Sequence, residues 1–147
     1  MSKTAIVYWS GTGNTEAMAN CIAEGVKDAG GDVTLFTPGE FSADKLGEFD
    51  TVAFGCPSMG AEQLEEGEFE PMFTALESAL SGRKIALFGS YGWGDGQWMR
   101  EWCERCTADG ADLYNEEGLI CNDAPDDDAK DSCRELGRKL GADLAAW

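Results

Sequence analysis

The stretch Ser10-Gly11-Thr12-Gly13-Asn14-Thr15 has the residue types and spacing of a phosphate-binding loop. It follows an apolar run at 4–9 and precedes a stretch with helical periodicity, which predicts a strand, a loop and a helix in succession. The first backbone N–H groups of a helix have no acceptors within it, and the helix dipole adds positive potential there. Glycines let such N–H groups converge, and hydroxyl and amide side chains can also donate. Because no Lys or Arg lies between Lys3 and Lys27, we expect neutral donors to bind an anion here.

Two other loops carry flat or polarisable apolar side chains. Met59 lies in a loop at 57–67, and Trp93 lies between glycines in a loop at 90–96. Neighbouring glycines cannot bury a tryptophan, so we expect Trp93 to cover a ligand rather than pack on the surface. An aromatic ring and a thioether on opposite sides can hold a planar apolar ligand, although Met59 alone is equally compatible with packing. The remaining large aromatic side chains near the motifs are expected in the core: Tyr8, Trp9, Trp98 and Trp102.

Several kinds of chemistry are excluded by residue type. The chain has no histidine, which excludes Ser-His-Asp and Cys-His catalysis and histidine metal sites. The loop at 10–15 lacks the third glycine of a dinucleotide fingerprint, and no glycine is followed by Lys-Ser or Lys-Thr as a P-loop requires. Cys103 and Cys106 lie within a predicted helix, without a second pair at zinc-finger spacing, so we expect a packing role.

Charge and cysteine content indicate the surroundings of the protein. Lys and Arg total 11 against 28 Asp and Glu, a formal net charge of -17, which disfavours nucleic acid and anionic membranes and favours basic protein partners. The apolar run after Lys3 is short and ends in a glycine loop, unlike a signal peptide, and no stretch has membrane-spanning length. We therefore expect a cytoplasmic protein whose six cysteines are mostly reduced and buried.

Strand and helix patterns alternate along the chain. Strands are predicted at 4–9, 33–36, 50–56 and 84–89, with less regular strand patterns at 112–114 and 119–121, and helices at 14–29, 43–46, 69–80, 98–106 and 126–145. This alternation predicts an α/β fold with a doubly wound, five-stranded parallel sheet in the order 2-1-3-4-5 and helices on both faces. In that order the loops after the first, third and fourth strands meet at one edge of the sheet.

Three motifs in this order closely resemble the short-chain flavodoxins. They are Tyr8 to Glu16, Met59-Gly60-Ala61-Glu62, and Gly89 to Gly96. The resemblance spans residues 1–147, as one FMN-binding domain, and the short turn at 115–118 is also typical of the short-chain type. It implies that residues 10–15 hold the FMN phosphate, that Met59 and Trp93 flank the isoalloxazine, and that Glu62 accepts a hydrogen bond from the ring N3–H.

The same resemblance implies roles for further residues. Backbone groups of Ser90, Tyr91, Gly92, Trp93 and Gly94 would line the pyrimidine side of the ring, and the peptide between Gly60 and Ala61 would turn its carbonyl toward flavin N5. Some relatives have a phosphate-binding serine where this chain has Pro57, a role that Ser58 could take, and some have an aspartate in place of Ala61.

The function implied is that of a low-potential, monomeric one-electron carrier. Non-covalently bound FMN would pass through its quinone, semiquinone and hydroquinone states between basic redox proteins, without a catalytic residue. Two alternatives stay open at this point. One is an FMN-dependent quinone or nitro-compound reductase, and the other is a non-redox FMN-binding module.

Overall fold

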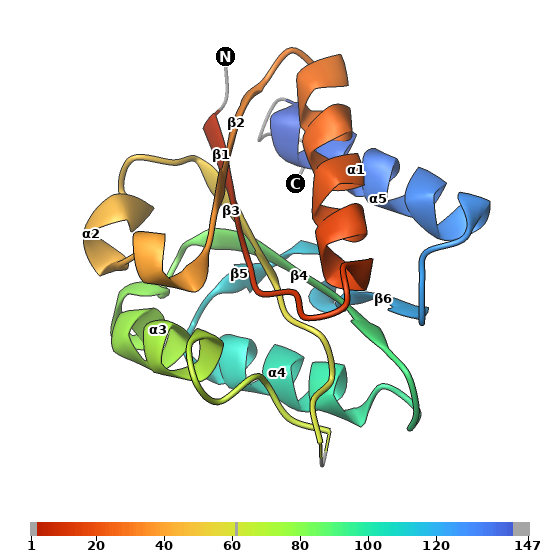
Figure 1. Ribbon diagram of the computed structural model, residues 1–147. Coiled ribbons are helices and arrows are strands. Elements are labelled where there is room, and N and C mark those ends of the chain that lie inside the picture. The colour runs from red at the N-terminus through yellow and green to blue at the C-terminus, as the bar shows by residue number, and fades with distance from the viewer. Residues whose placement is uncertain (1–2, 61, 143–147) are drawn as a thin grey trace.

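The structure is a computed structural model that describes residues 3–60 and 62–142 (Figure 1). The strands are β1 (Lys3–Tyr8), β2 (Asp32–Phe36), β3 (Thr51–Gly55), β4 (Lys84–Tyr91), β5 (Asp112–Leu113) and β6 (Leu119–Asn122). The α-helices are α1 (Asn14–Asp28), α2 (Ala43–Leu46), α3 (Phe69–Leu76), α4 (Gln97–Ala108) and α5 (Asp127–Gly141). The order and type of the predicted elements are confirmed, with ends that differ by a few residues; the last helix ends at Gly141, and residues 143–145 of its predicted range lie outside the described residues. None of these helices is long and apolar enough to span a membrane.

The sheet is parallel and has the predicted strand order. Its path is β2-β1-β3-β4-β5, and β6 also pairs with β4. β5 pairs with the first two residues of β4, and β6 pairs with Phe88 to Tyr91 at its far end. The fifth strand position is therefore filled by two short segments. Between them the chain turns through Asn115 and Glu116, both of which have positive φ (59° and 57°).

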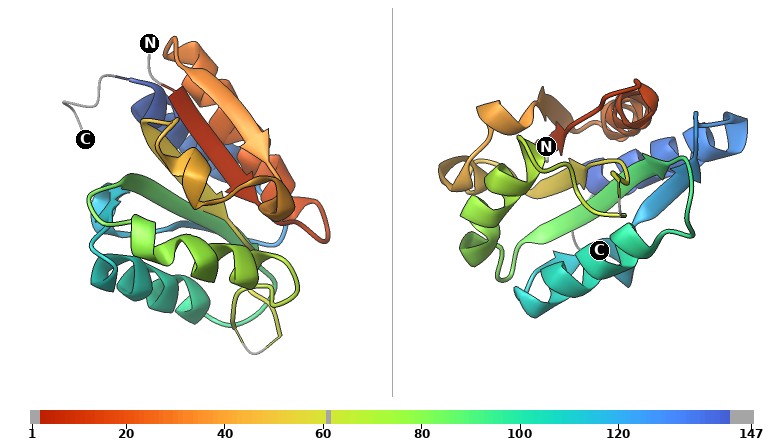
Figure 2. Two further views of the ribbon diagram at one scale, coloured as in Figure 1. Left: turned by 90° about the vertical axis from the view of Figure 1, so that its left-hand side faces the viewer. Right: turned by 60° about the horizontal axis from the view of Figure 1, so that its bottom comes forward.

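Helices cover both faces of the sheet, as Figure 2 shows. On one face α3 and α4 bury an aromatic cluster in which Phe54, Phe73 and Trp102 meet edge to face, with ring centroids 5.2 to 5.7 Å apart. On the other face α1 and α5 pack with glycines in contact, since a Cβ on Gly137 would lie 2.0 Å from the Ile22 carbonyl oxygen. All six cysteines are free and five are buried, as the sequence predicts.

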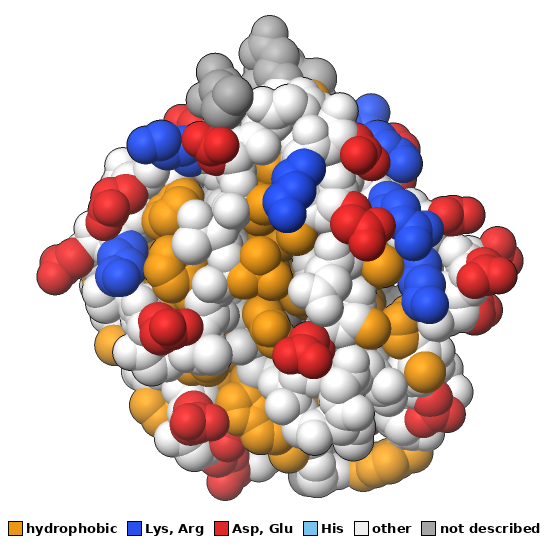
Figure 3. Space-filling view, turned by 45° about the horizontal axis from the view of Figure 1, so that its top comes forward, with side chains coloured by type: hydrophobic (Ala, Val, Ile, Leu, Met, Phe, Trp, Pro, Cys, Tyr) orange, Lys and Arg blue, Asp and Glu red, His pale blue; other side chains and the backbone are white. Residues whose placement is uncertain are grey.

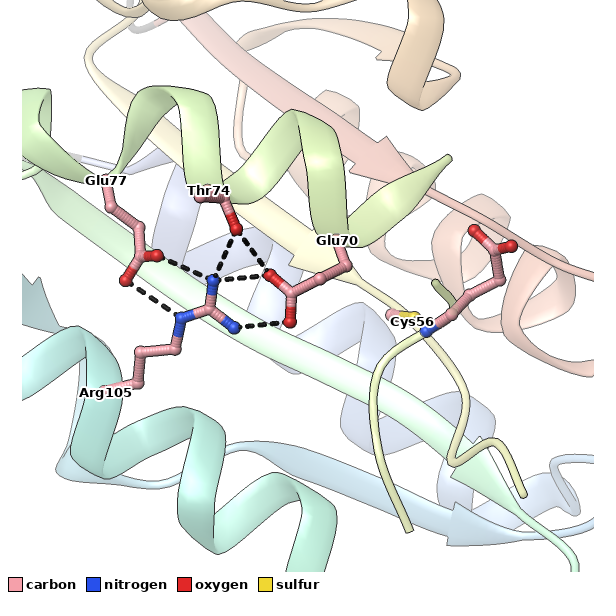
Figure 4. A network of polar contacts seen from close by, with 6 residues as sticks. Cys56, Glu70, Thr74, Glu77 and Arg105 are labelled. Atoms are coloured by element: carbon pink, nitrogen blue, oxygen red, sulfur yellow. Dashed lines mark hydrogen bonds and ion pairs between the residues drawn. The ribbon is translucent and has the colours of Figure 1, made fainter. Parts of the chain in front are cut away.

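One arginine ties the helices of the aromatic face together (Figure 4). Arg105 of α4 donates to the carboxylates of Glu70 at 2.8 Å and Glu77 at 2.6 Å, and its guanidinium lies 5.0 Å from the ring centroid of Phe73. Hydrogen bonds from Arg105 outweigh partial burial and hold the pKa of Glu70 and of Glu77 below its usual range. This network fixes α3 against α4, the two helices that follow the loops at 57–67 and 90–96.

The register of the sheet brings the ends of β1, β3 and β4 together. Tyr8 lies beside Gly55, and Gly55 beside Phe88. β4 runs to Tyr91, two residues beyond the predicted strand, because β6 pairs with its end. Ser90 and Tyr91, expected in a loop, are therefore held in a strand, and the three loops of the candidate site start from one fixed edge.

Candidate functional site

The loop after β1 forms a cradle of backbone N–H groups at the start of α1. Gly13 precedes the helix with a φ of +96°, a conformation that glycine adopts without strain. The Ser10 hydroxyl oxygen accepts hydrogen bonds from the N–H groups of Gly13 (3.1 Å) and Glu16 (3.3 Å). The N–H groups of Asn14 and Thr15 belong to the first turn and have no acceptor within the helix. They remain available to an anion, together with the hydroxyl proton of Ser10.

Thr15 links this cradle to the end of β4. Its side chain is buried, and its hydroxyl oxygen lies 3.1 Å from that of Ser90, which is also buried. The Ser90 backbone N–H also donates to the Thr15 hydroxyl at 3.4 Å. The Thr15 hydroxyl is thus engaged within the protein, and its backbone N–H is the group that remains for a phosphate.

The loop after β3 folds back on itself as a tight turn. Met59 and Gln63 exchange two backbone hydrogen bonds, of 2.8 and 3.0 Å. Between them Gly60 and Glu62 have positive φ (43° and 54°), while Ala61 lies outside the described residues. The two ends of this turn are therefore paired, and its tip has an unusual backbone conformation.

Glu65 fixes the end of this loop to the start of α3. Its carboxylate accepts from the N–H groups of Gly67, Glu68 and Phe69 at 2.7 to 2.9 Å, and its own N–H donates to the Cys56 sulfur at 3.3 Å. Burial disfavours ionisation of Glu65, but the three N–H donors outweigh it and hold its pKa below the usual range. Glu65 therefore has a structural role in positioning the loop.

A hollow of about 220 Å³ lies between the three loops. It brings together half of the predicted site residues and at least two from each of the three loops. Its lining consists of Trp9, Gly11, Thr12, Asn14, Pro57, Ser58, Met59, Ser90, Tyr91, Gly92 and Asp123. The cradle, Met59 and residues 90–92 thus border one space, as the sheet order predicts.

Trp9 and Asp123 border this hollow although the sequence did not single them out as site residues. Trp9 was expected in the core; it packs against the core only partly, and its indole N–H donates to Glu68 at 2.8 Å. Its place directly after β1 and directly before the cradle was the signal that could have identified it. Asp123 has a φ of +56° and its N–H donates to the Tyr91 carbonyl at 2.7 Å. It reaches the site only because β6 pairs with β4.

Glu62 and Gly94 lie in contact with each other, and neither of them lines this hollow; Glu62 lines a second hollow, against α4. The Oε1 atom of Glu62 is buried and has no hydrogen-bond partner among the described residues. A Cβ on Gly94 would lie 2.2 Å from this oxygen, so glycine leaves the space that Glu62 occupies. A buried acceptor without a donor is costly unless a ligand supplies the donor.

Trp93 is the most exposed large apolar side chain in the described part of the chain, at 63%. It does not line the hollow, and its ring has a free face for a ligand or a partner. The site therefore offers N–H donors for a phosphate, an acceptor without a partner, and apolar groups on two loops. These features fit an elongated ligand with a phosphate at one end and a planar ring with an N–H at the other.

Known proteins similar to this chain share both its sequence and its fold. The sequence profile of the flavodoxin family matches residues 6–136. The chain is 47% identical to the flavodoxin of Clostridium beijerinckii, over 92% of this chain and 96% of the relative, and 48% identical to that of Megasphaera elsdenii, over 90% and 93%. The solution structure of two-electron reduced Megasphaera elsdenii flavodoxin superposes with a TM-score of 0.86 at 46% identity, covering 94% of this chain and 98% of that one.

The chain belongs to the flavodoxin family. The alignments cover 96% and 93% of the two relatives, so these flavodoxins have almost the same length as this chain, in agreement with the short-chain type. A flavodoxin binds FMN and carries electrons to redox partners, and it is not an enzyme. The two flavodoxins compared above favour neither the reductase nor the non-redox module, both of which were open from the sequence.

The charges around this flavodoxin site are almost all negative. The loops at 10–15, 57–67 and 90–96 contain no Lys or Arg, whereas four acidic residues lie within them: Glu62, Glu65, Glu66 and Asp95. Arg100 at the start of α4 pairs with Asp95 at 2.9 Å, and its hydrogen bond and charge hold the pKa of Asp95 below its usual range. Figure 3 shows another face, the one at the top of Figure 1, where Lys and Arg side chains lie beside Asp and Glu.

Proposed function

We propose that the chain is a low-potential one-electron carrier that holds FMN across the three loops and serves basic partner proteins. The cradle at 10–15 binds the phosphate through neutral donors. The ring lies between Met59 and Trp93, with Glu62 accepting from its N3–H. The observation that carries this placement is the buried Oε1 of Glu62, which has no hydrogen-bond partner among the described residues and lies in the same turn as Met59, a residue that lines the hollow bordered by the cradle.

The remaining site residues complete this arrangement. Ser58 has its backbone N–H bonded to the Ser90 carbonyl at 3.0 Å, which fixes the start of the turn against β4. Backbone groups from Ser90 to Gly94 line the pyrimidine edge of the ring. The peptide between Gly60 and Ala61 would turn its carbonyl toward N5 and accept a hydrogen bond from an N–H there. Glycine at position 60 keeps this reorientation inexpensive.

Bound FMN supplies one-electron redox chemistry, and the protein sets its potentials. The acidic residues around the site disfavour the addition of negative charge. In water-like dielectric, a unit charge about 10 Å away shifts a potential by roughly 15–20 mV before salt screening. Several such charges add up, so we expect the second electron to require a low potential.

The same field selects the partner. A protein with a basic surface is attracted to the acidic loops, and the exposed ring of Trp93 offers it an apolar contact. Nucleic acid and anionic membranes are repelled. We further propose that the protein works in the cytoplasm, as a monomer with residues 1–147 forming a single domain, because a small acidic carrier that is exchanged between partners needs no permanent subunit.

The experiment is an anaerobic redox titration of the FMN-loaded protein followed by visible absorption. We expect two separate one-electron potentials, the second of them low. Neutralising Glu66 by Glu66→Gln should raise the second potential, whereas Glu48→Gln, at the opposite end of the sheet beside Lys3, should leave it unchanged. A single two-electron step would overturn the one-electron proposal, and equal potentials in the two variants would overturn the role of the acidic field.

A further inference from the structure

Trp9 spans the distance between the phosphate cradle and the loop that holds the flavin ring. Its backbone N–H donates to the Gly55 carbonyl at 3.0 Å, which fixes it to β3. Its ring lies against the cradle, since a Cβ on Gly11 would be 3.0 Å from the outer edge of the indole. The side chain is partly buried. It borders the hollow together with residues of the cradle and of the loop at 57–67.

The far end of the indole is held by Glu68, the residue before α3. The Trp9 Nε1–H donates to Glu68 Oε2 at 2.8 Å. Glu68 is itself fixed, because its backbone N–H donates to the Glu65 carboxylate at 2.8 Å. A chain of contacts therefore runs from Gly11 through Trp9 and Glu68 to Glu65, which positions the loop at 57–65.

We propose that Trp9 contacts the cofactor and that its hydrogen bond to Glu68 couples phosphate binding in the cradle to ring binding by the 57–65 loop. This rests on the proposed placement of FMN. A phosphate that orders residues 10–15 fixes the ring of Trp9, and Trp9 then fixes Glu68 and the loop. Glu68 is exposed, and its negative charge repels an anionic cofactor. Its role as the hydrogen-bond acceptor of the Trp9 indole gives a reason for a glutamate at this position.

Thermodynamic linkage makes the coupling measurable, because a ligand that raises the affinity for a second ligand has its own affinity raised by the same factor. Riboflavin is FMN without its phosphate, so riboflavin and inorganic phosphate can be bound separately by the apoprotein. The coupling factor is the riboflavin Kd without phosphate divided by the Kd with saturating phosphate. We expect a factor well above one in the unmodified protein. Because Thr15 and Ser90 form a second link between the loops, losing the Trp9–Glu68 bond should reduce this factor rather than abolish it.

The matched variants are Glu68→Ala and Glu68→Gln. Both remove the same charge, but glutamine keeps an oxygen acceptor for the indole and alanine does not. We expect Glu68→Ala to lower the coupling factor about fivefold and Glu68→Gln to retain it. Trp9→Phe, which keeps a ring and removes the N–H, should behave as Glu68→Ala does. In the apoprotein, the indole N–H resonance of Trp9 should shift in Glu68→Ala and stay near its original position in Glu68→Gln.

A role of Glu68 in stability alone would change the riboflavin Kd equally with and without phosphate, leaving the factor unchanged. An unchanged factor in Glu68→Ala therefore overturns the coupling, as does a factor near one in the unmodified protein. Because Glu68 is exposed, its variants should fold even where Trp9→Phe does not. Failure of the unmodified apoprotein to bind FMN at all would overturn the proposed function as well, which distinguishes the two failures.

Discussion

A methyl group added at Gly94 tests whether Glu62 is positioned for the cofactor. The new Cβ would lie 2.2 Å from Glu62 Oε1, so the carboxylate must move. The move costs the fold little because the carboxylate is the end of a flexible side chain. The φ of +84° at Gly94 adds about 1–2 kcal/mol for any residue with a Cβ. We therefore expect Gly94→Ala to lower stability modestly and to weaken FMN binding more.

The size of the binding loss follows from the hydrogen bond that Glu62 would give up. Hydrogen bonds that involve a charged group contribute about 1.5–3 kcal/mol, and each 1.4 kcal/mol is tenfold in affinity. The FMN Kd of Gly94→Ala should rise about 10- to 100-fold. The assay is titration of the apoprotein with FMN, followed by quenching of flavin fluorescence, with urea unfolding of the apoprotein as the stability measurement.

Gly92→Ala is the matched control in the same loop. Its Cβ would meet only Asp123 at 3.6 Å, an ordinary contact, and its φ is not positive. The Glu62→Ala background completes a double-mutant cycle, in which Gly94→Ala should add little further loss of affinity. A Kd for Gly94→Ala within twofold of that for Gly92→Ala would refute the reasoning, and so would full additivity in the cycle.

Three further outcomes are expected. Gly60→Ala, at a φ of +43°, should bring the two one-electron potentials closer together in a redox titration, and unchanged potentials would contradict the role of this peptide. Gly137→Ala should cost about 1–3 kcal/mol of stability in urea unfolding through overpacking of α1 on α5, whereas Gly39→Ala, with open space around it, should not. Burial raises the pKa of Asp109 to about 6, and a hydrogen bond with Glu77 and the negative charge of Glu77 add to this effect. This group stabilises the fold at low pH and loses that contribution as pH rises through about 6, so Asp109→Asn should gain stability relative to the unmodified protein at pH 7 and lose this gain near pH 4.

Much of the fold could be predicted because local patterns and topology agree. The apolar runs, the helix that begins at Asn14 and the glycines that end the first helix gave the correct order of elements. The strand order then brought residues 10–15, Met59 and Tyr91 to one edge of the sheet. These predictions depend on residues close in sequence and on rules that hold for most parallel sheets.

The parts that could not be predicted depend on contacts between distant residues. The extension of β4 to Tyr91 requires pairing with β6. The paired residues Tyr91 and Asn122 are 31 positions apart in the sequence. The bond from Trp9 to Glu68 joins residues 59 positions apart, and a helix-starting glutamate has no local signature of that role. The ion pair between Asp95 and Arg100 could not be predicted from the motif either, because Arg100 lies outside the loop that carries it.

The paired ends of the turn at Met59 and Gln63 also bear on how fast the protein can exchange electrons. Both hydrogen bonds between these residues can persist while the backbone at the tip changes conformation. On the proposed placement of FMN, we expect the cradle, Glu65 and β4 to keep their positions when the oxidation state changes, because their hydrogen bonds do not involve the tip of the turn. A site whose polar groups are already in place needs little rearrangement when the charge on the cofactor changes. We therefore expect a low reorganisation energy of electron transfer, and fast exchange with partners whose potentials differ only slightly from that of the carrier.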